Sequence, residues 1–144
     1  MSRFRLLAIY LLLSSISTVN AQKLSSRRWN DCLIIIMASD PSNSIILDQT
    51  IKFKKSESGL KERKIVIYRA LPDKYQIGLN ESSAWETSGN IYESMKETNS
   101  DFEIVLIGLD GGIKLRREEL LTTNELFGVI DQMPMRRAEL DKKN

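Results

Sequence analysis

Two pairs of adjacent arginines near the C-terminus carry the groups in this sequence that are best suited to bind an anion. Arg116-Arg117 and Arg136-Arg137 stand on either side of a helix-like segment, and Lys114 precedes the first pair. A guanidinium group can hold a carboxylate or phosphate with two parallel hydrogen bonds. These five residues are therefore predicted as a candidate binding surface. Pairing within the chain is the alternative, and we favour it for most of them, because acidic residues lie nearby in sequence: Glu118, Glu119, Asp131 and Glu139.

The chain has one cysteine and no histidine, which excludes several kinds of catalytic site. An internal disulfide is impossible, and His-based triads and most zinc sites are ruled out. Cys32 begins an apolar segment, so we expect it to be buried and to act as a small hydrophobic residue. A redox role of Cys32 with a partner's thiol is the alternative, because Arg27 and Arg28 lie close in sequence. The sequence predicts no metal site and no cofactor.

Two other polar clusters fit structural roles better than catalytic ones. Asp40 precedes Pro41 and suits the N-cap of a helix. Ser42 as a nucleophile would need a base, and none is placed nearby in the sequence. The segment 110–112, Asp-Gly-Gly, predicts a tight hairpin, because a calcium loop needs more oxygen ligands than one carboxylate.

The first residues are typical of an export signal. Arg3 and Arg5 give a charged start, an apolar run follows over 6–13, and Val19-Asn20-Ala21 fits the small-x-small pattern of signal peptidase. The apolar run is shorter than the ~20 residues that a membrane-spanning helix needs. We therefore predict a signal peptide over 1–21 and an exported protein, periplasmic or extracellular, with no membrane span after the signal is removed.

The charge balance changes once that signal is removed. The chain has 21 Lys and Arg against 19 Asp and Glu, and loss of Arg3 and Arg5 leaves 19 of each sign. A mature chain without net charge lacks the basic field that nucleic-acid binding needs, so nucleic acid is not a predicted partner. Residues 22–144 have the length of a single domain with one core.

Hydrophobic patterns predict a strand, a helix and a second strand in the first half of the mature chain. Residues 31–38 form a continuous isoleucine-rich run, as in a strand that is buried on both faces. A helix is expected over about 41–57, with Gly59 as its stop. The second strand is expected over 64–71.

The middle of the chain is harder to interpret. Residues 73–88 are polar, show no clear periodicity and are predicted as a loop, and Trp85 within them has no assigned role. Trp29 directly precedes the first strand, so we expect it to pack against the core or its rim. A short helix is predicted over 90–98.

A hairpin and a capped helix are predicted to close the domain. Strands over 101–109 and 113–116 flank the glycine turn. Thr122 and Glu125 fit a capping box at the start of the last helix, and Pro134 is its expected end. The resulting order, β-α-β-α-β-β-α, predicts an α/β fold of the thioredoxin-like type, with a four-stranded mixed sheet and flanking helices.

Three segments resemble a known bacterial family. "LIGLDGGIKLR" and "ELFGVIDQMPMRR" resemble motifs of the family called domain of unknown function 4174, and "RRWNDCLIII" resembles its opening. The similarity spans roughly residues 24–140. It implies an exported, thioredoxin-like domain without an assigned reaction, similar to the DUDES domain of animal extracellular-matrix proteins, which is described as peroxiredoxin-like. It implies no catalytic residue.

The residues that active thioredoxins need are absent. Redox-active relatives carry a Cys-x-x-Cys pair where the first strand meets the first helix, but 39–44 contains no cysteine. They also carry a cis-proline before the third strand, but 98–101 contains no proline. We therefore predict a non-catalytic domain that binds a protein or envelope component through the basic hairpin–helix end and the 73–88 loop. The alternatives are thiol-redox or peroxiredoxin-like activity through Cys32, and anion binding by the arginines. The oligomeric state is not predicted.

Overall fold

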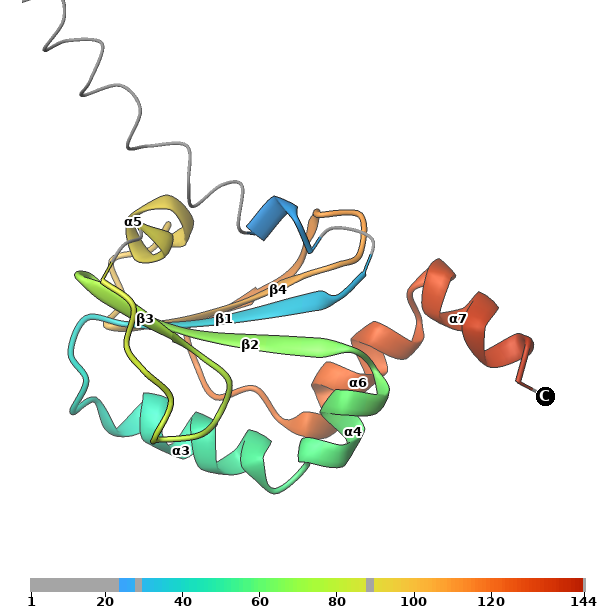
Figure 1. Cartoon of the computed structure of the whole chain (residues 1–144), viewed down its shortest axis with the longest axis horizontal. Coiled ribbons are helices and arrows are strands. Elements are labelled where there is room, and N and C mark those ends of the chain that lie inside the picture. The colour runs from blue at the N-terminus through green and yellow to red at the C-terminus, as the bar shows by residue number, and fades with distance from the viewer. Residues whose placement is uncertain (1–23, 28–29, 88–89, 144) are drawn as a thin grey trace, which may run out of the picture.

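A five-stranded sheet lies at the centre of the computed structural model, which describes residues 24–27, 30–87 and 90–143. Its strand order is β3-β2-β1-β4-β5 (Figure 1). β1 runs parallel to β2, and the other neighbouring pairs are antiparallel. The strands are β1 (Cys32–Ala38), β2 (Ile65–Leu71), β3 (Lys74–Ile77), β4 (Phe102–Ile107) and β5 (Ile113–Arg117). The helices are α3 (Ser44–Lys54), α4 (Glu57–Glu62), α5 (Ile91–Met95), α6 (Thr123–Asp131) and α7 (Pro134–Asp141).

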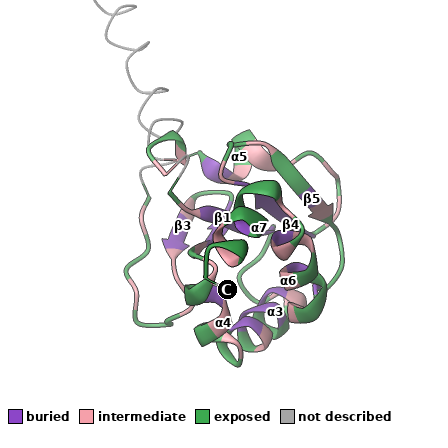
Figure 2. Ribbon diagram, turned by 90° about the vertical axis from the view of Figure 1, so that its right-hand side faces the viewer, coloured by how far each residue is buried: buried purple, intermediate pink, exposed green. Residues whose placement is uncertain are grey.

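β1 forms the centre of the core because it is buried along its whole length. Successive side chains of a strand point to opposite faces of the sheet. Ile34 and Ile36 pack on the face that α3, α4 and α6 cover, whereas Ile35 and Met37 pack on the face that α5 covers (Figure 1). In Figure 2 the strands with purple, buried segments lie between α5 on one side and α3, α4 and α6 on the other, and these helices have exposed outer surfaces. The prediction of a strand buried on both faces is thus confirmed.

The predicted α/β class with a mixed sheet and flanking helices is confirmed, but the predicted number of four strands is wrong. The fifth strand, β3, lies inside the segment predicted as the 73–88 loop and pairs with β2 at one edge of the sheet. Its sequence, KYQI, is too short and polar to stand out as an apolar run. The chain after β3 is held by Arg69, which donates to the carbonyl oxygens of Gly78 (3.0 Å) and Asn80 (2.9 Å).

The first helix, α3, begins later in the sequence than predicted. Asn43, and not Asp40, is the N-cap of α3, and its side chain accepts a hydrogen bond from the backbone N–H of Ile45 at 2.9 Å. Asp40 instead accepts from the backbone N–H of Ser42 at 2.7 Å and closes a turn ahead of the helix. An aspartate two residues before an available N–H can form such a turn, and here it delays the helix.

The first helix also ends earlier than predicted, and a second helix follows it. α3 stops at Lys54, and α4 contains Gly59, which was predicted as a helix stop. A Cβ atom on Gly59 would lie 2.7 Å from the ring of Phe127 in α6. The glycine is therefore required for the close approach of α4 to α6 and not for ending a helix.

The C-terminal half follows the prediction more closely, although the predicted last helix is two helices. Gly111 has a φ of 80°, as the tight turn requires, and the side chain of Asp110 accepts from Gly112 N–H at 2.9 Å. Thr122 caps α6 by accepting from the backbone N–H of Glu125 at 3.2 Å. Pro134 opens α7 as its first residue, which was not predicted.

A buried glutamine joins α3 to the segment that leads into α6. The side chain of Gln49 donates to the carbonyl oxygen of Leu121 at 3.0 Å and accepts from the backbone N–H of Leu121 at 2.8 Å. Both residues are almost fully buried. Because no water reaches these groups, the glutamine satisfies two backbone atoms that would otherwise lack partners.

We expect the substitution Gln49→Leu to lower the free energy of unfolding by about 1 to 3 kcal/mol, since it leaves the backbone groups of Leu121 unsatisfied. Urea unfolding followed by circular dichroism measures this change. The control is Gln132→Leu, the same substitution at an exposed residue. Equal losses of stability in the two variants would contradict a specific role of the Gln49 side chain.

Candidate functional site

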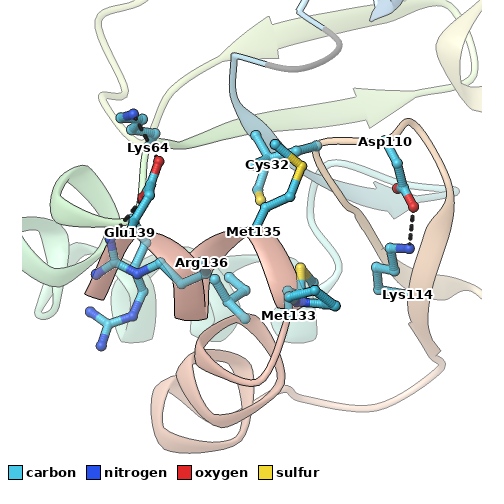
Figure 3. Close-up of a pocket in the computed structure, with 12 residues that line it drawn as sticks. Cys32, Lys64, Asp110, Lys114, Met133, Met135, Arg136 and Glu139 are labelled. Atoms are coloured by element: carbon cyan, nitrogen blue, oxygen red, sulfur yellow. Dashed lines mark hydrogen bonds and ion pairs between the residues drawn. The ribbon is translucent and has the colours of Figure 1, made fainter. Parts of the chain in front are cut away.

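A cavity of about 250 Å³ opens beside the amino end of β1. Four parts of the chain surround it: the start of β1, the residues before β2, the β4–β5 hairpin, and the turn that joins α6 to α7 (Figure 3). Its apolar wall comes from Cys32, Leu109, Ile130, Met133, Pro134 and Met135. Its charged lining comes from Arg63, Lys64, Asp110, Lys114, Arg136 and Glu139. This is the hairpin–helix end at which the sequence predicted binding.

Cys32 lies in the wall of this cavity with only 3 % of its surface exposed. Burial raises the pKa of its thiol, and a backbone hydrogen bond from Leu109 acts in the opposite direction. Arg27 does not activate the thiol in the manner that its place in the sequence had suggested, because it pairs with Asp31 at 3.0 Å and donates to the hydroxyl of Tyr68. Arg28 lies outside the described residues. A redox role of Cys32 stays a prediction, and this protonated, buried thiol does not favour it.

Arg136 is buried and holds α7 against the rest of the domain. Its guanidinium reaches Glu62 of α4 at 2.9 Å, Glu139 at 3.3 Å and Asp131 at 3.4 Å. Asp131 is also held by Arg63, whose Nη2 lies 2.7 Å from its carboxylate. The two cations and three carboxylates form a network at one side of the cavity, so the charge of Arg136 is already compensated.

The other charges at the cavity are paired as well. The ammonium of Lys114 lies 2.6 Å from the carboxylate of Asp110, and that of Lys64 lies 3.3 Å from the carboxylate of Glu139 (Figure 3). The register of β4 and β5 shifts between Leu106 and Ile107, as in a β-bulge. Lys114 has no partner residue across this shift and lines the cavity, whereas Arg116 turns toward α5. The two cations therefore do not project from one face of β5, although residues two positions apart in a regular strand would do so.

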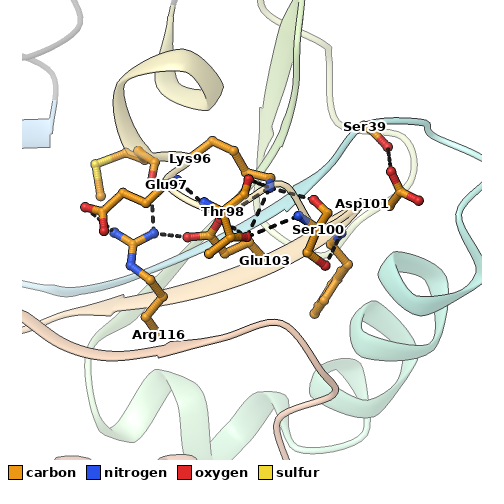
Figure 4. A network of polar contacts seen from close by, with 10 residues as sticks. Ser39, Lys96, Glu97, Thr98, Ser100, Asp101, Glu103 and Arg116 are labelled. Carbon is orange, nitrogen blue, oxygen red and sulfur yellow. Dashed lines mark hydrogen bonds and ion pairs between the residues drawn. The ribbon is translucent and has the colours of Figure 1, made fainter.

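Arg116 belongs to a second buried network, which is centred on Glu103 (Figure 4). Glu103 lies in β4 and is fully buried. One carboxylate oxygen contacts Arg116, and the other accepts from Thr98 Oγ1 at 3.0 Å and lies 3.4 Å from the ammonium of Lys96. Arg116 also lies 3.0 Å from Glu97. These contacts fold the chain ahead of β4 around the carboxylate.

The sequence analysis assigned no role to Glu103, although a signal was present. It is the single charged residue within the apolar run of β4, FEIVLI. An ionised carboxylate at an inward position of a strand must have charged or hydrogen-bonding partners, because an unpaired buried charge is very costly. In the structure, Lys96 and Arg116 are these partners.

The five predicted binding residues are not brought together at one site. Lys114 and Arg136 border the cavity beside Cys32, and Arg116 and Arg117 border a separate surface depression next to Thr98. Arg117 pairs with Glu125 at 3.1 Å, and Arg137 lies exposed on α7. Binding of an external anion by these residues stays a prediction, and most of them already have carboxylate partners.

The segment predicted as a second part of the binding surface lies elsewhere. It contains β3 at one edge of the sheet, whereas the hairpin ends in β5 at the opposite edge. Glu86 returns to pair with Tyr75 of β3, and the ammonium of Lys74 lies 5.3 Å from the ring of Trp85. Trp29 and the predicted signal peptide, 1–21, lie outside the described residues.

The carboxyl end of β1, where a thioredoxin dithiol would be expected, contains small polar residues. Ser39 donates to the carboxylate of Asp101 at 3.2 Å, and Ser42 donates to that of Asp40 at 2.6 Å. Within the part of the chain that the structure describes, no three side chains of His, Cys, Asp or Glu gather in a way that could hold a metal ion.

The sequence of this chain matches the model of one known protein family over most of its length. The profile of a domain of unknown function, DUF4174, matches residues 23–139. The chain belongs to the DUF4174 family. Among curated proteins and solved structures, none matches this DUF4174 domain. In its described residues, the domain has no helix with the length and apolar character to cross a membrane.

We expect Cys32 of this DUF4174 domain to react slowly with an alkylating reagent in the folded state, because its thiol is buried and its pKa is raised. The measurement is the rate of labelling followed by mass spectrometry, with and without urea. The matched control is a Cys32→Ala, Ala138→Cys variant, in which the thiol lies on the exposed surface of α7. The native thiol should react at least about tenfold more slowly than this control. Equal rates would show that Cys32 is accessible.

The network between α4, α6 and α7 makes stability depend on pH. Hydrogen bonding to Arg63 lowers the pKa of Asp131 below its ordinary value of 3.8, and Arg136 acts in the same direction. Because the folded state binds a proton here less readily than the unfolded state, the stabilisation is complete above the ordinary pKa. It is lost as the pH falls through the lower, folded value.

We therefore expect Asp131→Asn to be less stable than the native domain near neutral pH. The difference should shrink in acid, as Asp131 itself becomes protonated. The measurement is the free energy of unfolding from about pH 7 to about pH 2. Asp141→Asn removes the same charge from an exposed residue of α7 and serves as the control. A constant difference between Asp131→Asn and the native domain at every pH would contradict this role of the carboxylate.

Proposed function

We propose that this protein is an exported, thioredoxin-like, non-catalytic domain that binds a protein or envelope component at the cavity beside Cys32. The order β2-β1-β4-β5, with β1 parallel to β2 and antiparallel to β4, supports the thioredoxin-like assignment. β3 would then be an addition at the edge of that core. Export rests on the predicted signal peptide, 1–21, and the destination is the periplasm or the extracellular space.

The residues at the carboxyl end of β1 support a non-catalytic role. A thiol at the start of the first helix of a thioredoxin is acidified by that helix. The equivalent turn here is formed by Ser39, Asp40 and Ser42, which hydrogen-bond with one another or with Asp101. The sequence contains no histidine to activate a serine and no second cysteine to complete a disulfide.

The observation that carries the binding role is the cavity itself. Its floor and walls are apolar, and its mouth includes Met135, which is 45 % exposed. The charges around it are paired with one another, so they can frame an opening while the apolar wall receives an uncharged group. Such a concave, mostly apolar site with a few polar groups at its edge is typical of ligand-binding pockets.

The substitution Met135→Glu tests this proposal, because it places a charge at the apolar mouth without changing a fully buried residue. Metal-free mature protein is used to capture partners from the envelope fraction and medium of the source organism. We expect the captured partner to bind at least about tenfold more weakly to Met135→Glu, since a charge would have to be buried. Met135→Leu, which keeps the apolar surface, is the matched control and should retain the partner.

One further variant and one treatment of the extract separate binding at the cavity from binding by the exposed charges or by a thiol. Arg137→Ala removes an exposed cation from the same helix and should leave capture unchanged. Blocking of thiols in the extract should also leave it unchanged. A partner that binds Met135→Glu as well as the native protein would refute the cavity as the binding site. A partner lost only with Arg137→Ala would instead support the anion-binding alternative.

A further inference from the structure

Three sulfur atoms converge on the cavity beside β1. Cys32 contributes a thiol from the strand, Met133 contributes a thioether from the turn between α6 and α7, and Met135 contributes one from the first turn of α7. In Figure 3, Met135 extends its thioether toward Cys32, and the sulfur of Met133 faces the same space. The two methionines stand two positions apart around Pro134, which starts α7 and fixes the turn that presents them. The arrangement is therefore a group of soft ligands from two distant parts of the chain.

The hard ligands around the same cavity are engaged elsewhere. The carboxylate of Asp110 pairs with Lys114, and that of Glu139 pairs with Lys64 and Arg136. The chain has no histidine that could add a nitrogen ligand. Only sulfur remains available to an ion at the apolar wall. Thiolate and thioether ligands select Cu(I) among the biological metals, whereas carboxylates and water suit magnesium, calcium and manganese.

The charge of the complex favours a monovalent ion. One thiolate and two neutral thioethers carry a total charge of −1, so a monovalent cation forms a neutral complex. A divalent cation would leave one positive charge in an apolar cavity, where an uncompensated charge is very costly. The sulfur ligands and the charge of the site therefore both favour a soft monovalent cation.

We propose that Cys32, Met133 and Met135 form a binding site for Cu(I) in the cavity at the amino end of β1. The inference rests on the proposed function in taking this cavity as a ligand site, and it names an ion that the family match does not assign. Methionine has a flexible side chain with three rotatable bonds. The thioethers can therefore close over an ion bound to the thiol, with Met135 moving inward from the mouth.

The binding step conserves atoms and electrons. A Cu(I)–Sγ bond to Cys32 forms, the S–H bond of the thiol breaks, and the proton passes to the solvent. Copper stays in the +1 state, so no oxidant or reductant takes part. Binding should release one proton per ion and become stronger as the pH rises, because the ion displaces a proton from a thiol that is otherwise protonated.

The test uses the purified full chain, reduced and metal-free. Ag(I), a monovalent ion with the same preference for sulfur and no redox chemistry here, is the first probe, and Cu(I) under anaerobic conditions is the second. We expect one ion per chain by native mass spectrometry, the release of one proton near neutral pH, and a rise in the unfolding temperature. Zn(II) at the same concentration should not compete. Absence of 1:1 binding of either monovalent ion would overturn the proposal.

The methionines distinguish a built site from an ordinary thiol. The double variant Met133→Leu, Met135→Leu keeps the apolar volume but removes both thioethers, and its affinity for Ag(I) should fall by at least about tenfold. Met95→Leu, which changes a methionine on the α5 side of the sheet, is the matched control and should bind as the native protein does. Cys32→Ser should abolish binding, and Cys32→Ala checks this result if the serine variant does not fold. Unchanged affinity in the double methionine variant would show that the ion binds the thiol alone, and would overturn the proposal.

The two proposals fail separately. Partner capture is carried out with metal-free protein, so a partner that depends on Met135 can be found whether or not an ion binds. Loss of Ag(I) and Cu(I) binding with normal capture would reject the metal site and leave the proposed function standing. Normal binding of Ag(I) and Cu(I) without any partner that depends on the cavity would reject the proposed function and leave the metal site standing.

Discussion

The complete burial of β1 is the constraint on which the rest of the molecule depends. A strand without an exposed side chain must be paired along both edges and covered on both faces. β2 and β4 provide the two edges, and the helices on each side provide the two faces. Side chains along the strand therefore pack only within the core, and a ligand can approach β1 only at its two ends. Cys32 marks one of these ends and Ser39 follows the other.

Buried charged side chains fix the positions of those segments that have few apolar contacts of their own. α7 is polar along much of its length, and the buried guanidinium of Arg136 connects it to carboxylates of α4 and α6. Glu103 acts in the same way for the chain that enters β4. Each of these groups is costly to bury alone, so the surrounding segments can adopt only arrangements that supply its partners. In the same contacts, carboxylates of the chain neutralise arginines that the sequence predicted as a possible anion-binding site.

Local patterns explain which elements the sequence predicts correctly. β1, β2 and β4 are long apolar runs, and the cap of α6 depends on two residues three positions apart, so neither requires knowledge of distant contacts. β3, α4 and α7 are missed because they are short or polar and are stabilised by residues far away in sequence, as Gly59 shows by its contact with Phe127. Asp131 and Glu139 were expected partners of the arginines, but Glu62 lies 74 positions from Arg136 and could not be anticipated. The cavity was missed for the same reason, since its walls come from four separate parts of the chain.

The positions of the two ends of β1 explain how a thioredoxin-like frame, as proposed here, can serve a different chemistry. A thiol at the carboxyl end would meet the start of α3, where a helix favours the thiolate and hence disulfide exchange. The one thiol of this chain lies at the amino end, where burial raises its pKa and the neighbouring side chains are apolar. Such a thiol is a poor nucleophile, yet an ion that binds its sulfur can still displace the proton to the solvent. A cysteine at the carboxyl end of β1 would thus be a reactive thiol, whereas a cysteine at the amino end is suited to bind a metal ion. The same sheet can hold either one.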